Sequence, residues 1–349
     1  MTAAGRVTLN RRSLRCPDCG TAAHPADDRI GLDGFLSPQA TRLACLAAAS
    51  WSFDVASDRL EEIAGLRIDD ETIRHHVHRA AIELGDRRRA DPPRVAFAAA
   101  DGDIEFLTDG VMAPTREGWR EVKLARFQVW PAGDPAEPRA WADRELPGPA
   151  ASVCYATTAE STVFSACWAP WAVALGIDPA GELTVLAAGA AWIWSAATQQ
   201  FPAAEPVLAI FHASQHIAAA AAGLHGEGTA EAADWREHGR AKLLADGWPG
   251  LLDHVGQTPA EGRLAAGQTA VDERLRYFAK HTERVGYFGR LKRGRSIGSG
   301  AVEGLARRMG RRLKVPGRGW SLENIDGMAS LIATVDTPEW QRLWARPAA

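Results

Sequence analysis

The alternation of apolar and polar residues between positions 95 and 216 most constrains how this chain can fold. Period-two runs predict five strands, over residues 104–108, 122–129, 152–155, 183–186 and 206–211. A helix is expected over residues 161–175, with Pro170 as a kink or boundary, and a shorter one around residues 192–198. Three strands followed by strands alternating with helices predict an α/β domain with a mixed sheet. This order is that of a ribonuclease-H-like core.

The 349 residues are enough for two or three domains. The helix and strand patterns predict further segments on either side of the core. We expect a zinc-ribbon-like N-terminus (1–36), a helix-turn-helix DNA-binding segment (37–90), the ribonuclease-H-like core (95–216), an all-helical insertion (217–290) and a final core helix with a basic strip (291–335). Arg87 to Arg89 and the prolines after them are interpreted as a linker.

Residues 38–89 show helical periodicity in three stretches. Leu46 lies in the apolar stripe of the first and Ile63 in that of the second, and Asp69 is the expected N-cap of the third. Helix, turn and helix together predict a DNA-binding motif. Its recognition helix would present basic residues to DNA phosphate, and a solvated helix face is the competing interpretation. These residues are Arg74, His75, His76, His78 and Arg79.

Net charge is −3, but its distribution is uneven. Between positions 290 and 318 ten residues are Lys or Arg and only one, Glu303, is acidic. Such a strip attracts phosphate locally, although a solvated basic face has the same composition. The residues expected to contact DNA here are Arg307, Arg308, Arg311, Arg312, Lys314, Arg318 and, by stacking, Trp320. Trp192 and Trp194 are expected in the core.

Two acids are placed for phosphodiester chemistry. Asp109 is expected at the end of the first strand, and Glu303 follows a Gly-Ser-Gly turn that opens a helix. Two Mg²⁺ (or Mn²⁺) ions about 3.5–4 Å apart can activate a nucleophile and stabilise the leaving oxygen, and they require converging carboxylates. The competing interpretation of Asp109-Gly110 is an ordinary turn.

Several blocks resemble the ISKra family of insertion-sequence transposases, from about residue 6 to residue 344. Residues 104–123 around Asp109-Gly110 resemble its first catalytic block, and Leu186-Ala-Ala188-Gly-Ala-Ala-Trp-Ile-Trp194 resembles the second. Phe211-His-Ala-Ser-Gln-His216 resembles an Asp-x-x-His block, and Ile297-Gly-Ser-Gly-Ala-Val-Glu303 the block with the last acid. Cys16-x-x-Cys19 and residues 34–38 resemble the family's N-terminal part.

The resemblance implies a catalytic site in which an Asp, a second Asp and a Glu bind divalent metal ions. An enzyme with this site cuts DNA and transfers strands at the terminal repeats of the insertion sequence. Asp109 takes the first position and Glu303 the third, but the second falls on Ala188, which cannot bind metal. Ala209 and Gln215 also replace acids that are usual in the family. We therefore expect a transposase with impaired cleavage. The alternatives are a catalytically inactive, decayed or repurposed DNA-binding protein and, third, a helix-turn-helix regulator with a sensor domain.

Two supporting groups accompany these acids. His212 and His216 are spaced to share one helix face, and packing or hydrogen bonding behind the site is the preferred interpretation. Glu182 would begin the strand that ends near Ala188, roughly 20 Å away at 3.3 Å per residue, so it is not expected to replace the missing acid.

Cysteine use and hydropathy indicate the compartment. Cys16 and Cys19 have the spacing of half a zinc ribbon and His24 is a candidate third ligand, but a structural Zn²⁺ site needs four. No N-terminal signal or membrane-length apolar stretch is apparent. We expect a cytoplasmic bacterial protein that acts on DNA as a homo-oligomer, with no membrane partner.

Overall fold

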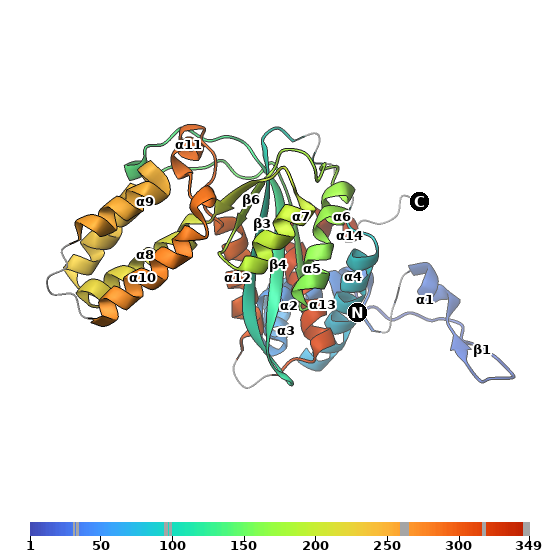
Figure 1. Cartoon of the computed structure of the whole chain (residues 1–349). Coiled ribbons are helices and arrows are strands. Elements are labelled where there is room, and N and C mark those ends of the chain that lie inside the picture. The colour runs from blue at the N-terminus through green and yellow to red at the C-terminus, as the bar shows by residue number, and fades with distance from the viewer. Residues whose placement is uncertain are drawn as a thin grey trace.

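A computed structural model of the chain describes residues 1–30, 32, 35–93, 97, 100–258, 265–315 and 319–344. A β-sheet with helices on both faces forms the centre of the molecule (Figure 1). A helical arm projects from one side of this core, and the N-terminal segment projects from the other.

The sheet confirms the predicted α/β class. Its five strands lie in the order β5-β4-β3-β6-β7. Neighbours among β3, β4 and β5 are antiparallel, whereas β6 runs parallel to β3 and β7 parallel to β6. The strands are β3 (Asp103–Thr115), β4 (Gly118–Trp130), β5 (Ala151–Thr157), β6 (Thr184–Ala187) and β7 (Glu205–Leu208).

Strand β3 is longer than its period-two run predicts. It continues through Asp109-Gly110 to Thr115, so this dipeptide is not a turn and Asp109 does not end the strand. The hairpin turns instead before Gly118, whose φ of 103° favours glycine. Gly110 serves close packing, because a Cβ at this position would meet the carboxylate of Glu121 on β4.

Different helices cover the two faces of the sheet (Figure 1). One face carries Phe106 and Phe127, which pack with Trp168 and Phe201. The helices over it are α5 (Ser161–Ala166), α6 (Trp168–Ala174) and α7 (Ala191–Gln200). The break between α5 and α6 falls at Cys167 rather than at Pro170. Behind the sheet lie α12 (Gly300–Leu313) and α13 (Leu322–Val335).

The three N-terminal helices form as predicted. They are α2 (Pro38–Ser50), α3 (Phe53–Ala64) and α4 (Asp70–Ala90). Asp69 caps α4 by accepting the Thr72 N–H at 2.8 Å, and Gly65 ends α3 with a left-handed φ of 64°. Two stripe residues are exceptions, because Leu46 is 38% and Ile63 72% exposed. Amphipathic spacing predicted the positions of the helices, but it did not predict which of their apolar residues are buried.

The predicted linker around Arg88 is wrong. This residue lies in the last turn of α4, is 2% exposed, and donates to both carboxylate oxygens of Glu339 at 3.0 and 2.8 Å. Glu339 belongs to α14 (Pro338–Leu343), near the end of the described chain. Close packing of Gly327 on the backbone of Ala81 also brings α13 against α4. The helix-turn-helix segment is therefore packed on the core.

The arm consists of α8 (Ile210–His225), α9 (Ala230–Gln257) and α10 (Ala265–Ala279), which pack on one another. It begins before the predicted insertion, because β7 ends at Leu208 and α8 follows at once. Gly247, with φ 63° and ψ −145°, interrupts α9. After the arm come η2 (Thr282–Arg284) and α11 (Tyr287–Lys292), which lead back to the sheet.

The N-terminal segment contains the small pair β1 (Leu14–Arg15) and β2 (Ala22–Ala23), followed by α1 (Pro25–Ile30). Backbone hydrogen bonds join its start to the core, among them Ser37 N–H to the Met1 carbonyl at 2.9 Å. Between β4 and β5 lies η1 (Pro138–Ala140). None of the described helices is long and apolar enough to cross a membrane.

Candidate functional site

Asp109 and position 188 are neighbours where β6 ends. In the parallel pairing of β3 and β6, Thr108 lies opposite Ala187, which is the last residue of β6. The next residues along the two strands are Asp109 and Ala188. At this point β3 continues without its parallel neighbour, so the carboxylate lies at an open position on the sheet. The alignment of the two positions agrees with the sequence expectation.

Glu303 approaches the same place from behind the sheet. The Ile210 N–H donates to the Ile297 carbonyl at 2.9 Å, which ties the segment before α12 to the start of α8. Helix α12 then runs along β3, with Glu303 in its first turn. The Ser299 hydroxyl donates to the Glu303 carboxylate and fixes its direction.

The surroundings of Asp109 act on its pKa in opposite directions. Burial raises the pKa of Asp109, while the Gly110 N–H, at 2.8 Å from its carboxylate, lowers it. The charge of His212 also lowers the pKa of Asp109, whereas Glu303 and Glu121 raise it. Asp109 therefore lies within electrostatic reach of His212, Glu303 and Glu121, the last of which sequence reasoning missed. Glu121 pairs with Met112 in the hairpin, and its side chain lies against Gly110.

The residues present do not fit a two-ion metal centre. Among the described residues, no group of three or more His, Cys, Asp or Glu side chains is placed to hold a metal ion. Ala188 supplies no ligand, and Ala209 is fully buried at the N-cap of α8, with its N–H donating to the Ala187 carbonyl at 2.9 Å. Two dications need more negative charge than Asp109 and Glu303 provide.

Neutral or positively charged side chains of the arm lie near Gly189, the residue after Ala188. A Cβ on Gly189 would collide with Tyr277 of α10. The His216 ring stacks on Tyr277 with centroids 3.5 Å apart, and Arg274 Nη1 lies 3.4 Å from its Nδ1. Burial, followed by the charge of Arg274, lowers the pKa of His216 to about 4. No spacing motif in α10 signalled this contact between the arm and the sheet.

His212 and His216 of α8 therefore differ in environment. His216 packs in the arm, as its preferred interpretation predicted. The Nε2 atom of His212 is buried and has no hydrogen-bond partner among the described residues. Gln215, between them in sequence, is exposed. A shared metal-ligand face is not formed by these two residues.

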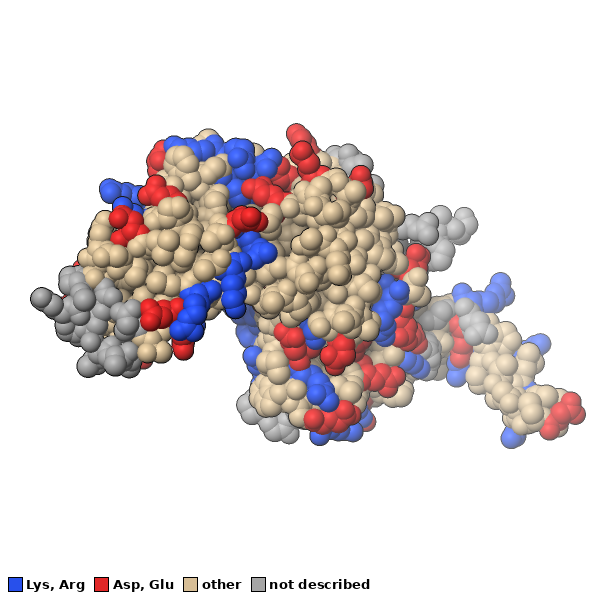
Figure 2. Space-filling view, in the orientation of Figure 1, with Lys and Arg blue, Asp and Glu red and all other residues tan. Residues whose placement is uncertain are grey.

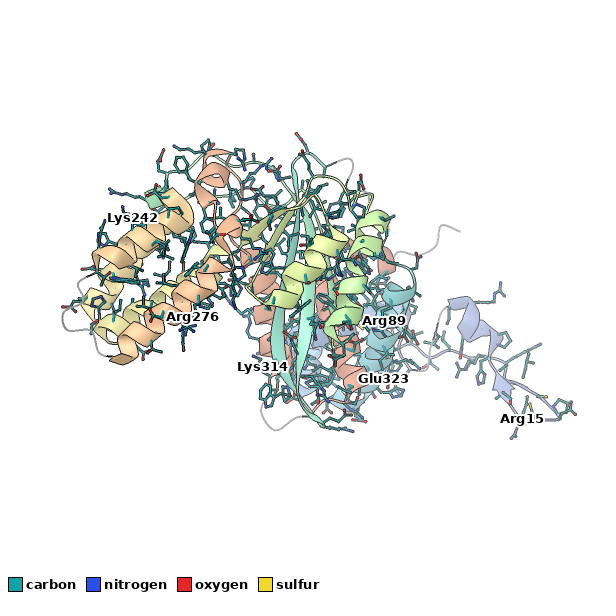
Figure 3. The ribbon with its side chains drawn as sticks, in the orientation of Figure 1. Arg15, Arg89, Lys242, Arg276, Lys314 and Glu323 are labelled. Carbon is teal, nitrogen blue, oxygen red and sulfur yellow. The ribbon has the colours of Figure 1, made fainter. Side chains whose placement is uncertain are left out.

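Part of the basic strip is exposed. Arg307, Arg311 and Lys314 lie on the outer side of α12, and Figure 3 labels Lys314 at its end. None of the three takes part in the ion pairs found between described residues. Arg308 is half-buried and pairs with Asp336, and Arg318 lies outside the described residues. Figure 2 shows further Lys and Arg side chains along the notch between arm and core.

Arg312 and Trp320 are not available to DNA, contrary to the prediction. Arg312 is 3% exposed, donates from Nε to the Ala48 carbonyl at 2.5 Å, and places its guanidinium 4.8 Å from the Phe53 ring centroid. Trp320 is 9% exposed and donates to the Leu313 carbonyl at 3.0 Å. Arg312 also stacks on Trp320, at 5.1 Å. This cation–aromatic cluster fastens α12 to the N-terminal helices.

The proposed recognition helix is only partly exposed. Arg74 is exposed and pairs with Glu71, whereas Arg79 is half-buried beside His76, at 3.2 Å from its Nδ1. His76 is buried. His78 packs on Phe53 and Trp320, and burial lowers its pKa to about 4. Burial of His76, and the lowered pKa of the half-buried His78, disfavour contacts of these two rings with phosphate, while His75 remains exposed.

Cys16 and Cys19 lie in a tight turn between β1 and β2. The Cys16 N–H donates to the Thr21 carbonyl at 2.9 Å, and the Gly20 N–H donates to the Cys16 carbonyl at 3.0 Å. A hydrogen bond with Thr21 lowers the pKa of the Cys19 thiol to about 7. This geometry suits half of a zinc site, but two thiols are half the ligands needed. Zinc binding stays a prediction.

Comparison of the sequence with models of known protein families and with curated proteins finds no match.

Proposed function

We propose that this chain is a transposase-like DNA-binding protein with a ribonuclease-H-like core, and that Ala188 impairs its DNA cleavage and strand transfer at insertion-sequence ends. The order β5-β4-β3-β6-β7, with three antiparallel strands followed by two parallel ones, supports the fold assignment. Helix α12 brings a further acid back to the first strand of that sheet, as such a core requires.

One observation carries the functional proposal. Ala188 follows the last residue of β6 beside Asp109, and Glu303 is close enough to raise the pKa of that aspartate. This is the arrangement of a three-acid phosphodiester site with its middle member replaced. Burial makes the Asp109 carboxylate costly for the fold, which is expected where function rather than stability has selected it.

DNA is the proposed partner. Arg307, Arg311 and Lys314 form an exposed row on α12, the helix that also carries Glu303. Phosphates held by this row would lie beside the carboxylates. We propose binding to the terminal repeats of the element, by a homo-oligomer in the bacterial cytoplasm.

We assign separate roles to the residues of the site, and none of these roles requires a bound metal ion. Asp109 and Glu303 provide negative charge at one place, and Ser299 orients the Glu303 carboxylate. The exposed cations of α12 position the phosphate backbone. Since the ligand set is incomplete, Mg²⁺ or Mn²⁺ is not expected to bind tightly enough for rapid cleavage.

The test compares nicking of a labelled duplex element end, in Mg²⁺, by the wild-type chain and by Ala188→Asp. We expect strand cleavage to increase at least 100-fold in the variant, because the third carboxylate is restored. Ala188→Asn is the matched control of similar size without the charge, and Ala188→Asp with Asp109→Asn should lose the gain. Rapid cutting by the wild-type chain would contradict impairment. Absence of both duplex binding and cutting in every variant would overturn the proposal.

A second candidate is a repurposed DNA-binding protein without catalysis. Its support is the set of neutral and cationic groups at the site, namely Ala209, His216, Tyr277 and Arg274, around a position where a dication would need acids. If this alternative is right, the Ala188→Asp variant does not cut DNA. The wild-type chain still binds the duplex end, and its affinity falls as the salt concentration rises.

A further inference from the structure

A cavity of about 400 Å³ lies between the end of β4, the start of α8 and the start of α12, and neither Asp109 nor Glu303 is among the residues that line it. Its walls include Trp130, Trp141 and Phe211, and Arg144 enters it from the segment between η1 and β5. Gly298 and Gly300 border it at the start of α12. The volume is within the range of sites for small organic ligands.

Aromatic rings form one part of this cavity. The Trp141 and Phe211 centroids are 5.9 Å apart and their planes meet at 58°. Phe211 is 41% exposed, which is unusual for a ring of this size next to the folded core. The guanidinium of Arg240, from α9 of the arm, lies 5.3 Å from the Trp141 ring centroid and holds the indole from behind. A flat, aromatic ligand matches these surfaces, because bases stack on such rings regardless of sequence.

Hydrogen-bond donors without acceptors form the other part of the cavity wall. The Nη1 atom of Arg144 and the Nε1 atom of Trp130 are both buried without a hydrogen-bond partner among the described residues. Burial, and then the positive charge of Arg290, lower the pKa of Arg144. Buried donors without acceptors are costly, so an acceptor that enters the cavity would be bound favourably.

The nearest carboxylate does not satisfy these donors. Glu105 accepts from the Ser296 hydroxyl at 2.7 Å and from the Gln128 amide at 2.8 Å, and it lies 3.6 Å from Arg290. It is 1% exposed and committed to those partners. The region around Arg144 therefore keeps an excess of positive charge that an anion would neutralise.

The start of α12 contributes in the same direction. This helix has 14 residues, and its N-terminus carries partial positive charge. The Ser299 hydroxyl donates to Glu303 and does not cap the helix N–H groups. Together with Arg144, the first turn offers an environment for phosphate.

We propose that this cavity binds one unpaired nucleotide unit, with its base against Trp141 and Phe211 and its phosphate between Arg144 and the first turn of α12. The assignment to a DNA strand rests on the proposed function, whereas the ligand chemistry does not. Phe211 precedes His212, and Gly300 begins the turn that holds Glu303. A nucleotide held here would lie next to the position where a strand is cut.

The first experiment measures binding of radiolabelled deoxyadenosine monophosphate by equilibrium dialysis, and of a fluorescent eight-nucleotide single strand by anisotropy. Arg144→Gln and Trp141→Ala should each weaken binding at least tenfold, since each removes one half of the site. Arg139→Gln changes an exposed cation in η1 of the same segment and should stay within twofold of wild type. Deoxyadenosine and orthophosphate, each alone, should bind at least tenfold more weakly than the nucleotide.

The outcomes separate the sources of the ligand. Binding of the single strand that depends on Trp141 and Arg144 supports a DNA strand, and binding of the mononucleotide alone supports a free nucleotide. Equal binding by wild type, Trp141→Ala and Arg144→Gln, or no binding of either probe, overturns the proposal. Trp141→Phe, which keeps the ring, should retain affinity and excludes a folding defect. Binding of a blunt duplex and the Ala188→Asp cleavage assay report on the proposed function separately.

Discussion

Glu105 and Asp109 lie on the same face of strand β3 but in opposite circumstances. Both are withdrawn from water, and burial raises the pKa of each. Glu105 is surrounded by Arg290, Ser296 and Gln128, which neutralise or hydrogen-bond it. Asp109 accepts from the Gly110 N–H, and His212 also lowers its pKa, while the Glu303 and Glu121 carboxylates oppose this effect.

The contrast separates a structural acid from a functional one. The Glu105 network joins the segment after α11 to the start of the sheet, and Arg290 extends it by donating to Glu205 at 2.6 Å. Nothing comparable stabilises Asp109, so its carboxylate is available to a ligand and is a cost to the fold.

The largest expected effect follows from removing Arg290, the cation that pairs with the buried Glu105 carboxylate. Arg290→Met leaves the buried Glu105 charge without its partner and should lower the free energy of unfolding by about 3–5 kcal/mol. Urea denaturation followed by circular dichroism measures this. Arg293→Met, at an exposed neighbour that pairs with Glu205, is the control and should cost less than about 1 kcal/mol. Equal losses in both variants would contradict a special role for Arg290.

A smaller loss is expected from the hydrogen-bond partner of Glu105. Gln128→Leu keeps the approximate volume but removes a buried donor, and should lower the free energy of unfolding by about 1–3 kcal/mol. The same denaturation experiment applies. Gln199→Leu, at an exposed position of α7, should stay close to wild type. A neutral Gln128→Leu would mean that Ser296 and Arg290 satisfy the carboxylate alone.

The opposite sign is expected at the other acid. Asp109→Asn removes a charge that burial, Glu303 and Glu121 disfavour, and should raise the free energy of unfolding at pH 7 by on the order of 1 kcal/mol. Asp101→Asn, at an exposed position before β3, should leave stability unchanged. If Asp109→Asn destabilises the chain as Arg290→Met does, the two acids do not differ in the way proposed here.

The sequence predicted the α/β class with a mixed sheet because this class depends on backbone periodicity and on the order of elements along the chain. Strand length, on the other hand, depends on partners. Period-two alternation stopped at Asp109-Gly110, but hydrogen bonds to β4 carry β3 on to Thr115. Local patterns contain no information about such long-range pairing.

The sequence also did not predict which way individual side chains point. A run of Arg residues predicts charge on the surface, yet Arg88, Arg290 and Arg312 are buried against carboxylates, carbonyls or rings far away in sequence. Composition cannot distinguish them from Arg307 and Arg311, which are exposed on α12. Trp320 was misassigned for the same reason, because its partner Phe53 comes from the N-terminal helices.

The finest test of the comparison is the pH dependence of the difference between wild type and Asp109→Asn. The pKa of Asp109 is raised in the folded chain above its ordinary value of 3.8, so the folded state keeps its proton over a range where the unfolded state has lost it. The free energy of unfolding of wild type should therefore fall, relative to the variant, as pH rises from 3.8 through the folded pKa. Below that range both forms of residue 109 are neutral and the two curves should converge. Urea denaturation at intervals from pH 3.5 to 7.5 gives the difference directly. If the free energy of unfolding of wild type instead rises relative to the variant as pH rises, the folded chain stabilises the Asp109 carboxylate. Asp109 would then belong with the satisfied acids rather than with a site short of ligands.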